Sequence, residues 1–359
     1  MSNRVVIGMS GGVDSSVAAY LLLEQGYEVI GVTLKLRSDE AMGIDSGKDG
    51  CCSLSAVEDA RNVCNKLNIP FYVLNFTDIF EERVIKYFIN EYFEGRTPNP
   101  CIACNKYVKF DALIRKAKAL EADFIATGHY ARIVYDSHID RYLIKKSATV
   151  EKDQTYVLYN LTQNQLKHIF MPLGDYTKVQ TRAIAKELGF DVADKPDSQE
   201  ICFVEDNDYG KFLMQNRGSD IKPGNFVDIF GNVIGKHKGI VNYTIGQRKG
   251  LGIAVGKPMY VIDIIPDKNI VVLGDEDRVF KNELIAGNLN FIPFDRLEKQ
   301  IYVKSKIRYS AKEADATVIP IENDKVKVVF NDAQRAITPG QAVVFYQNDT
   351  VVGGGVIIS

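Results

Sequence analysis

The sequence predicts an α/β protein in which an N-terminal doubly wound parallel sheet is followed by a small β-rich domain and a C-terminal β-barrel. Strands alternate with helical stretches up to about residue 203, which is typical of a mostly parallel sheet covered by helices. Beyond residue 205, helical periodicity fades and short β-branched runs appear. Because 359 residues exceed what one core usually serves, we expect domains at 1–205, 206–280 and 281–359.

In the N-terminal part, apolar runs and amphipathic periodicity define the elements in order. Ligands of open α/β sheets bind at the carboxyl ends of strands, where the strand order reverses. We therefore expect the residues that follow the first, second and fourth strands to surround one nucleotide. The expected strands are 5–9, 28–36, 71–75 and 123–127, the helices 53–67, 78–93 and 106–120, and the main loops 37–50 and 95–104.

The C-terminal part contains two sets of short strands separated by turn residues. The first set predicts a small β-rich domain and the second a closed barrel. The expected strands of the first set are 226–230, 260–265 and 270–273, and those of the second are 301–309, 317–320, 326–330, 342–346 and 351–358.

The segment Ser10–Ser16 reads SGGVDSS and lies between the first strand and a helical run. Adjacent glycines let an anion approach the backbone, and the helix that follows offers N–H groups and a positive dipole end. Asp14 can hold the loop or a magnesium ion. No lysine follows the glycines, so a Walker A loop is disfavoured. The string resembles the phosphate loop (PP-loop) of ATP pyrophosphatases, which cleave ATP between the α and β phosphates; the alternative is a plain glycine turn.

Charge and hydropathy limit the partners. The net charge is −2, so nucleic-acid binding requires a local basic patch. Residues 229–262 supply five positive charges and no acidic residue, although a solvated lysine-rich face is the alternative. No run of about 18 apolar residues and no basic, apolar leader occurs, which predicts a cytosolic protein without a membrane partner. The five basic residues are Lys236, Lys238, Arg248, Lys249 and Lys257.

Cysteines form the second informative pattern. A cytosolic chain is not expected to hold structural disulfides. Cys101 and Cys104 form a C-x-x-C motif before a predicted helix, whose N-terminus favours a reactive thiolate. Cys202, in DSQEICF, is the natural partner thiol, and Cys64 fits core packing. Half of a zinc site completed by Cys51-Cys52 is a weaker alternative.

Motifs along almost the whole chain resemble one family. They are the phosphate loop, TPNPCIACN, ATGHY, KDQTYVLY, DSQEICF, YTIGQRKGLGI, RYS and TPGQ. The family is the bacterial-type tRNA-uridine 2-sulfurtransferase, or tRNA-specific 2-thiouridylase. This resemblance implies that ATP, with Mg²⁺, adenylates O2 of the wobble uridine in the tRNA anticodon loop and releases pyrophosphate. Sulfur from a cysteine persulfide then gives 2-thiouridine and AMP, and a cysteine desulfurase or relay carrier is the expected sulfur-donor partner.

The resemblance also assigns roles to individual residues. Cys202 matches the persulfide-carrying cysteine, and Cys104 matches the nucleophile that forms a transient disulfide with it. Asn99, Pro100 and Cys101 match the segment beside the target base. The ATP-binding positions are Gly8, Met9, Ser10, Gly11, Gly12, Val13, Asp14, Ser15, Leu34 and Gly128, and the tRNA contacts are His129, Lys152, Asp153, Gln154, Arg308, Tyr309 and Gln341.

Cys101 departs from the family pattern, because many members have an aspartate there. Cys101, Cys104 and Cys202 could instead ligate an iron–sulfur cluster, and this interpretation stays open beside the persulfide one. Two other classes also remain: another PP-loop enzyme, such as an amidotransferase-type synthetase or a lysidine-forming tRNA ligase, and a non-enzymatic RNA-binding or metal-carrying scaffold. The other PP-loop enzyme would not need Cys104 and Cys202.

Overall fold

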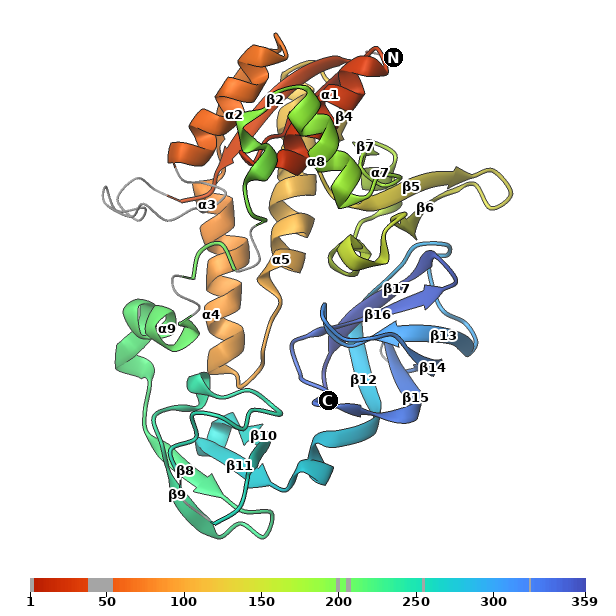
Figure 1. Ribbon diagram of the computed structural model, residues 1–359. Coiled ribbons are helices and arrows are strands. Elements are labelled where there is room, and N and C mark those ends of the chain that lie inside the picture. Colours follow the sequence, from red (N-terminus) through yellow and green to blue (C-terminus); the bar gives the residue numbers. More distant parts are fainter. Residues whose placement is uncertain (1–2, 38–53, 198–200, 205–207, 254–255, 323) are drawn as a thin grey trace.

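The computed structural model describes residues 3–37, 54–197, 201–204, 208–253, 256–322 and 324–359 (Figure 1). Three sheets organise the chain: a five-stranded parallel sheet, a four-stranded sheet and an eight-stranded sheet that includes a closed barrel. The predicted fold class is therefore confirmed. The predicted loop 37–50 lies, from residue 38 onward, outside the described residues, as do Cys51 and Cys52.

The N-terminal sheet has the strand order β3-β2-β1-β4-β7, and its neighbouring strands are parallel. The chain moves outward from β1 to β2 and β3, and then returns to the other side of β1 with β4 and β7. The strand order thus reverses between β1 and β4, which is where ligands of open α/β sheets bind. The strands are β1 (Arg4–Gly8), β2 (Glu28–Lys35), β3 (Phe71–Asn75), β4 (Phe124–Ala126) and β7 (Ile169–Phe170).

Helices cover both faces of this sheet. Along β1 the side chains alternate: Val5 and Ile7 belong to one buried cluster, and Val6 belongs to the other. The first cluster packs under α1 (Val13–Glu24), α2 (Leu54–Lys66) and α8 (Lys178–Glu187). The second cluster packs under two longer helical stretches, residues 77–93 and 100–119. The first stretch consists of α3 (Thr77–Phe80), η1 (Glu81–Ile85) and α4 (Lys86–Phe93), and the second of α5 (Pro100–Ala103), η2 (Cys104–Ala112) and α6 (Leu113–Ala119).

The small β-rich domain has the strand order β10-β11-β8-β9. Its core is built on Phe226, Val261, Val271 and Leu273, which are buried. Helix α9 (Tyr209–Arg217) precedes it and was not predicted, because its mixed polar sequence carries little helical periodicity. The strands are β8 (Gly224–Val227), β9 (Val233–His237), β10 (Tyr260–Ile265) and β11 (Ile270–Gly274).

The C-terminal barrel closes where β12 pairs with β17. The sequence missed β12 and also the hairpin β5–β6, which belongs to the N-terminal part but pairs with β17 through Lys145 and Thr350. The barrel sheet is thus extended by a hairpin from the first half of the chain. Its strands are β12 (Phe280–Phe291), β13 (Ile301–Lys306), β14 (Ala314–Ile321), β15 (Lys325–Arg335), β16 (Ala342–Gln347) and β17 (Thr350–Ile357), with β5 (Ala131–Asp136) and β6 (Arg141–Lys146).

Short helical turns join these elements. The α-helical one, α7 (Gln163–Leu166), starts with a capping box in which Thr162 and Gln165 exchange hydrogen bonds. The 3₁₀ turns described are η3 (Val150–Lys152), η4 (Thr155–Val157), η5 (Asp191–Asp194), η7 (Gly218–Asp220), η8 (Ile240–Asn242), η9 (Pro266–Lys268) and η10 (Glu276–Val279).

Candidate active site

The loop between β1 and α1 is braced from within. Gly11 has φ +70°, and a Cβ there would overlap the backbone of Ala56 in α2, so a residue without a side chain is required. The Ser16 hydroxyl is buried and donates to the Gly12 carbonyl (2.9 Å), and the Ser15 hydroxyl donates to the same oxygen (3.1 Å). These two hydroxyl groups hold the loop in its conformation, and the loop backbone can then face an anion.

The ends of β1, β2 and β4 meet at this loop. A Cβ on Gly128 would lie 2.8 Å from the Ser15 nitrogen, so the turn after β4 touches the first turn of α1. On the other side, the Leu34 side chain of β2 lies beside Gly8. Thr33 donates to the Met9 carbonyl (2.8 Å) and fixes the start of the loop. The residues that were predicted to surround a nucleotide are therefore brought together by the sheet.

Helix α8 supplies the loop with the cation that its own sequence lacks. Lys178 begins α8, and its ammonium contacts both oxygens of Asp14 (2.8 and 2.9 Å). The Tyr130 hydroxyl donates to the same carboxylate (2.7 Å). Burial, followed by the charge of Asp14, raises the pKa of Tyr130, so this hydroxyl stays a donor. Asp14 thus holds the loop.

The same lysine reaches the segment that leads to Cys202. Lys178 contacts Asp197 (2.6 Å), the first residue of the DSQEICF motif, and Lys152 contacts it from the other side (2.7 Å). Burial alone would raise the pKa of Asp197, but the hydrogen bonds from these two lysines hold it below its ordinary value. Asp197 therefore stays ionised and links the phosphate loop to the segment that carries a candidate catalytic thiol.

The C-x-x-C motif lies inside a helix, which corrects the predicted loop at 95–104. Asn99 caps α5 by accepting from the Cys101 N–H (3.1 Å), and Pro100 occupies the first helical position. Cys101 is exposed in this first turn, and Cys104 is buried one turn later. A helix N-terminus favours the thiolate form of cysteine. The Asn-Pro pair was a readable start signal for this helix.

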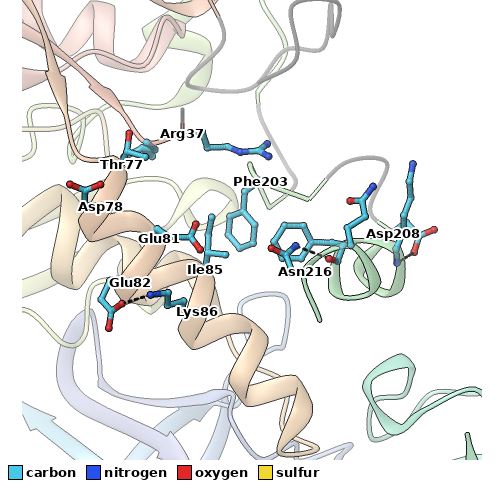
Figure 2. A pocket seen from close by; sticks show the side chains of 14 residues that line it. Arg37, Thr77, Asp78, Glu81, Glu82, Ile85, Lys86, Phe203, Asp208 and Asn216 are labelled. Atoms are coloured by element: carbon cyan, nitrogen blue, oxygen red, sulfur yellow. Dashed lines mark hydrogen bonds and ion pairs between the residues drawn. The ribbon is translucent and has the colours of Figure 1, made fainter. Parts of the chain in front are cut away.

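Cys202 is exposed on a turn that its neighbour anchors. The ring of Phe203 is buried and meets the rings of Phe80 and Phe88 edge-on, at centroid distances of 5.7 and 5.3 Å. Figure 2 shows Phe203 beside Ile85, between the α3–α4 helical segment and α9, in the wall of a cavity of about 670 Å³. Phe203 thus fixes the backbone beside Cys202 while the thiol faces outward.

Three domains meet immediately before the C-x-x-C motif. The Thr97 N–H donates to Pro339 (2.9 Å), and the Thr97 carbonyl accepts from Gln341 (2.9 Å), so the TPGQ turn of the barrel docks here. The Thr97 hydroxyl also contacts Thr244 of the small β-rich domain (3.3 Å). Sequence reasoning missed Thr97, although it lies in the TPNPCIACN motif.

The predicted tRNA contacts fall into one group at the barrel edge and another group that makes hydrogen bonds inside the protein. Tyr309 is 45% exposed, and burial followed by Asp153 raises its pKa, with Lys152 opposing and Cys101 adding to the shift. Lys152 of the KDQTYVLY motif and Cys101 of α5 are therefore both close enough to Tyr309 of the barrel to act on its hydroxyl. Arg308 is half-buried, and its guanidinium donates to the Arg335 carbonyl.

The other predicted contacts bond inward. His129 is buried beside Thr127 (2.7 Å), and burial, with a smaller contribution from Lys109, lowers the pKa of His129 to about 3. The Gln154 side chain accepts from the Tyr130 N–H (2.9 Å). His129 and Gln154 therefore make hydrogen bonds within the protein and support the backbone around the site.

No group of three or more His, Cys, Asp or Glu side chains able to hold a metal ion occurs in the part of the chain that the structure describes. Cys101, Cys104 and Cys202, as placed, therefore provide no ready cradle for an iron–sulfur cluster. Asp14, for which holding the loop and holding Mg²⁺ were the two predicted roles, is engaged by Lys178 and Tyr130.

The basic run 229–262 lies on the small domain. Lys257 pairs with Asp275 (2.6 Å), so one of its charges is locally neutralised. Gln247, at the start of the basic QRKG turn, accepts from the Thr244 N–H (3.0 Å), which ties this turn to the three-domain junction. The remaining basic side chains are exposed: Lys236, Lys238, Arg248 and Lys249.

These features define a nucleotide-binding α/β domain with an anion-binding loop and nearby thiols, joined to two β domains. The family models agree: residues 3–206 match a tRNA methyl transferase HUP domain, residues 210–275 a tRNA methyl transferase PRC-barrel domain, and residues 281–357 an aminomethyltransferase β-barrel domain. HUP domains include the PP-loop nucleotide-binding proteins.

Curated relatives cover almost the whole chain. The tRNA-specific 2-thiouridylase MnmA of Acetivibrio thermocellus is 64% identical over 354 residues, which is 99% of both chains. MnmA 2 of Caldanaerobacter subterraneus subsp. tengcongensis is 62% identical (99% of this chain, 98% of the relative), and MnmA of Clostridioides difficile is 61% identical with the same coverage. The chain belongs to the tRNA-specific 2-thiouridylase family. Among the described residues, no helix is long and apolar enough to span a bilayer.

Proposed function

We propose that this protein uses ATP to exchange O2 of the wobble uridine in tRNA for sulfur. Family membership supports the reaction class. The structural observation that carries the proposal is the contact chain Asp14–Lys178–Asp197, which joins the phosphate loop to the Cys202 segment. This contact chain supports a protein in which the adenylating site and the sulfur-carrying site lie in one domain.

In the first step, uracil O2 attacks the α phosphate of ATP, the bond to the β phosphate breaks and pyrophosphate leaves. The carbonyl oxygen then departs with AMP, which is a far better leaving group. The loop backbone and the N-terminus of α1 stabilise the phosphate charge. Mg²⁺ is expected to enter with the triphosphate, because it is usually bound through substrate phosphates and one or two carboxylates.

In the second step, the terminal sulfur of a Cys202 persulfide attacks C2, and AMP leaves. The Cys104 thiolate then attacks the Cys202 sulfur that is bonded to the base-linked sulfur. A Cys104–Cys202 disulfide forms, and the electron pair of the broken S–S bond stays on the sulfur at C2, which becomes 2-thiouridine. An external thiol must reduce this disulfide before the next turnover. A sulfur-donor protein, a cysteine desulfurase or a relay carrier, reloads Cys202, which is exposed for that purpose.

The target base must leave the anticodon loop to reach Cys101 and Cys104. Unstacking a base costs about a few kcal/mol, which contacts to the tRNA backbone must offset. The exposed basic side chains of residues 236–249 and the barrel edge at Arg308 and Tyr309 support this role.

The test is mass spectrometry of tRNA nucleosides after incubation with ATP, unmodified tRNA and a persulfide donor. We expect 2-thiouridine at the wobble position, together with AMP and tRNA-dependent release of pyrophosphate. Pyrophosphate release without thiolation would favour another PP-loop enzyme, and no release at all would favour a scaffold. Active protein with neither iron nor sulfide after anaerobic purification would exclude the cluster.

A further inference from the structure

Lys306, at the end of β13, places an ammonium beneath the barrel edge that meets the active site. Its Nζ lies 5.5 Å from the centre of the Tyr309 ring and 5.9 Å from that of Tyr156. These two rings meet edge-on, with centroids 6.1 Å apart. The lysine is therefore caged by two aromatic faces.

The charged groups around Lys306 and its partial burial determine how strongly its ammonium interacts with these two rings. In the described part of the chain, no carboxylate oxygen lies within ion-pair distance of its Nζ. Burial lowers the pKa of Lys306, whereas Asp153 and Glu313 oppose this shift and Lys146 adds to it. Glu313 is itself paired with Lys146 (2.6 Å). A partly desolvated ammonium without a bonded carboxylate interacts more strongly with an aromatic face than a solvated one.

Tyr309 is held on one side and open on the other. Tyr156 is fully buried, and its hydroxyl donates to the Ala342 carbonyl (2.8 Å), so it forms a rigid support. Tyr309 is 45% exposed and lies close enough to Cys101 for that thiol to affect its pKa. A fixed aromatic face beside this cysteine is suited to stack on a flat, unpaired base.

We propose that Lys306 is a positioning residue for sulfur transfer, which holds the Tyr309 ring so that its open face stacks on the extracted uracil beside Cys101. This inference rests on the proposed function and adds a residue that none of its motifs contains. The lysine acts through Tyr309 and does not touch the tRNA.

The test compares single-turnover 2-thiouridine formation at saturating tRNA with the Kd for tRNA. We expect Lys306→Met to slow thiolation about tenfold, because the ring loses its cation–π partner. The Kd for tRNA should change less than about twofold, because a phosphate contact is not lost. Lys306→Arg, which keeps a cation for the ring, should recover most of the rate. Lys306→Gln gives a second uncharged variant if the methionine variant folds poorly.

The matched control is Lys304→Met. Lys304 lies on the same strand and outer face but is exposed and pairs with Asp315 (3.1 Å), so its loss should leave the rate unchanged. In a Tyr309→Leu background, Lys306→Met should cause no further loss, because the residue through which it acts is gone.

Two results would overturn the inference while the wild type thiolates tRNA: equal rates for the Lys306→Met and Lys304→Met variants, or a weakened Kd with a shallower salt dependence that persists in the Tyr309→Leu background. The second result would make Lys306 a direct phosphate contact. A wild type that makes no 2-thiouridine would refute the proposed function itself, and the inference with it.

Discussion

Lys178 and Asp197 lie 2.6 Å apart, and this contact links the loop between β1 and α1 to the segment that leads to Cys202. Lys178 simultaneously contacts Asp14 in the phosphate loop, and its side chain is only 13% exposed. One ammonium thus bridges two carboxylates from segments that lie far apart in the chain, and Lys152 supplies a second positive charge to Asp197. Its removal would leave Asp14 with the Tyr130 hydroxyl and Asp197 with Lys152, and would break the bridge between them.

We therefore expect Lys178→Met to destabilise the fold by about 1–3 kcal/mol, below the cost of breaking a fully buried pair because the carboxylates are partly exposed. Pyrophosphate release should fall at least about tenfold, since the loop and the Asp197 segment lose their common partner. Chemical denaturation and a pyrophosphate assay measure the two effects. Lys186→Met, on the same helix but in an exposed pair with Asp194, is the control and should change neither.

The two proposed catalytic thiols should separate the half-reactions. Cys202→Ser and Cys104→Ser should each retain tRNA-dependent pyrophosphate release but form no 2-thiouridine, because adenylation needs no thiol and sulfur transfer needs both. Cys64→Ala should keep both activities, since Cys64 is buried and burial raises its pKa to about 12. Full thiolation by the Cys104 variant would remove the disulfide step from the mechanism.

Gly128 should tolerate no side chain. A Cβ at this position would lie 2.8 Å from backbone atoms of Asp14 and Ser15, so Gly128→Ala must displace the first turn of α1. We expect the KM for ATP to rise about tenfold or more. Gly218→Ala is the control, because its φ of −60° is helical and its near neighbour is a flexible methionine side chain. An unchanged KM for ATP in the Gly128 variant would place ATP elsewhere.

His129 should make the protein less stable in acid. Its pKa is about 3 in the folded state and about 6.5 when unfolded, so below pH 6.5 the unfolded chain binds a proton that the folded chain excludes. Stability contributed by neutral His129 is present above pH 6.5 and is lost as the pH falls towards 3, by at most about 1.4 kcal/mol per pH unit. Denaturation curves of His129→Gln should show a shallower pH slope than the wild type. The slope of His138→Gln, an exposed position, should match the wild type.

The local sequence was sufficient to predict those elements whose residue pattern is continuous along the chain. The strand at 71–75 was predicted with its observed bounds, and the phosphate loop was read from adjacent glycines between an apolar strand and a helix. The two strands predicted best in the small domain, 260–265 and 270–273, are rich in valine and isoleucine. In each case the pattern and the backbone requirement lie within a few neighbouring residues.

Two of the missed elements, strand β12 and the hairpin β5–β6, depend on partners far away in the chain. Strand β12 alternates exposed and buried residues weakly, and it is stabilised by pairing with β15 and β17. The hairpin β5–β6 extends a barrel whose other strands begin about 140 residues later. Tertiary pairing therefore overrode weak local signals.

By itself, the sequence determined the fold class, and it located the glycine loop and the cysteines that we propose as the phosphate site and the reactive thiols, because glycine, capping and cysteine patterns act over short distances. Only the tertiary structure decided which charges meet. It brought Lys178 to Asp14 and Asp197, placed Thr97 at the junction of three domains, and packed Tyr309 of the barrel against Tyr156 of the N-terminal domain. The physical reason is that ion pairs and ring contacts depend on distances in space, which packing of the sheet and barrel fixes and a linear pattern does not encode.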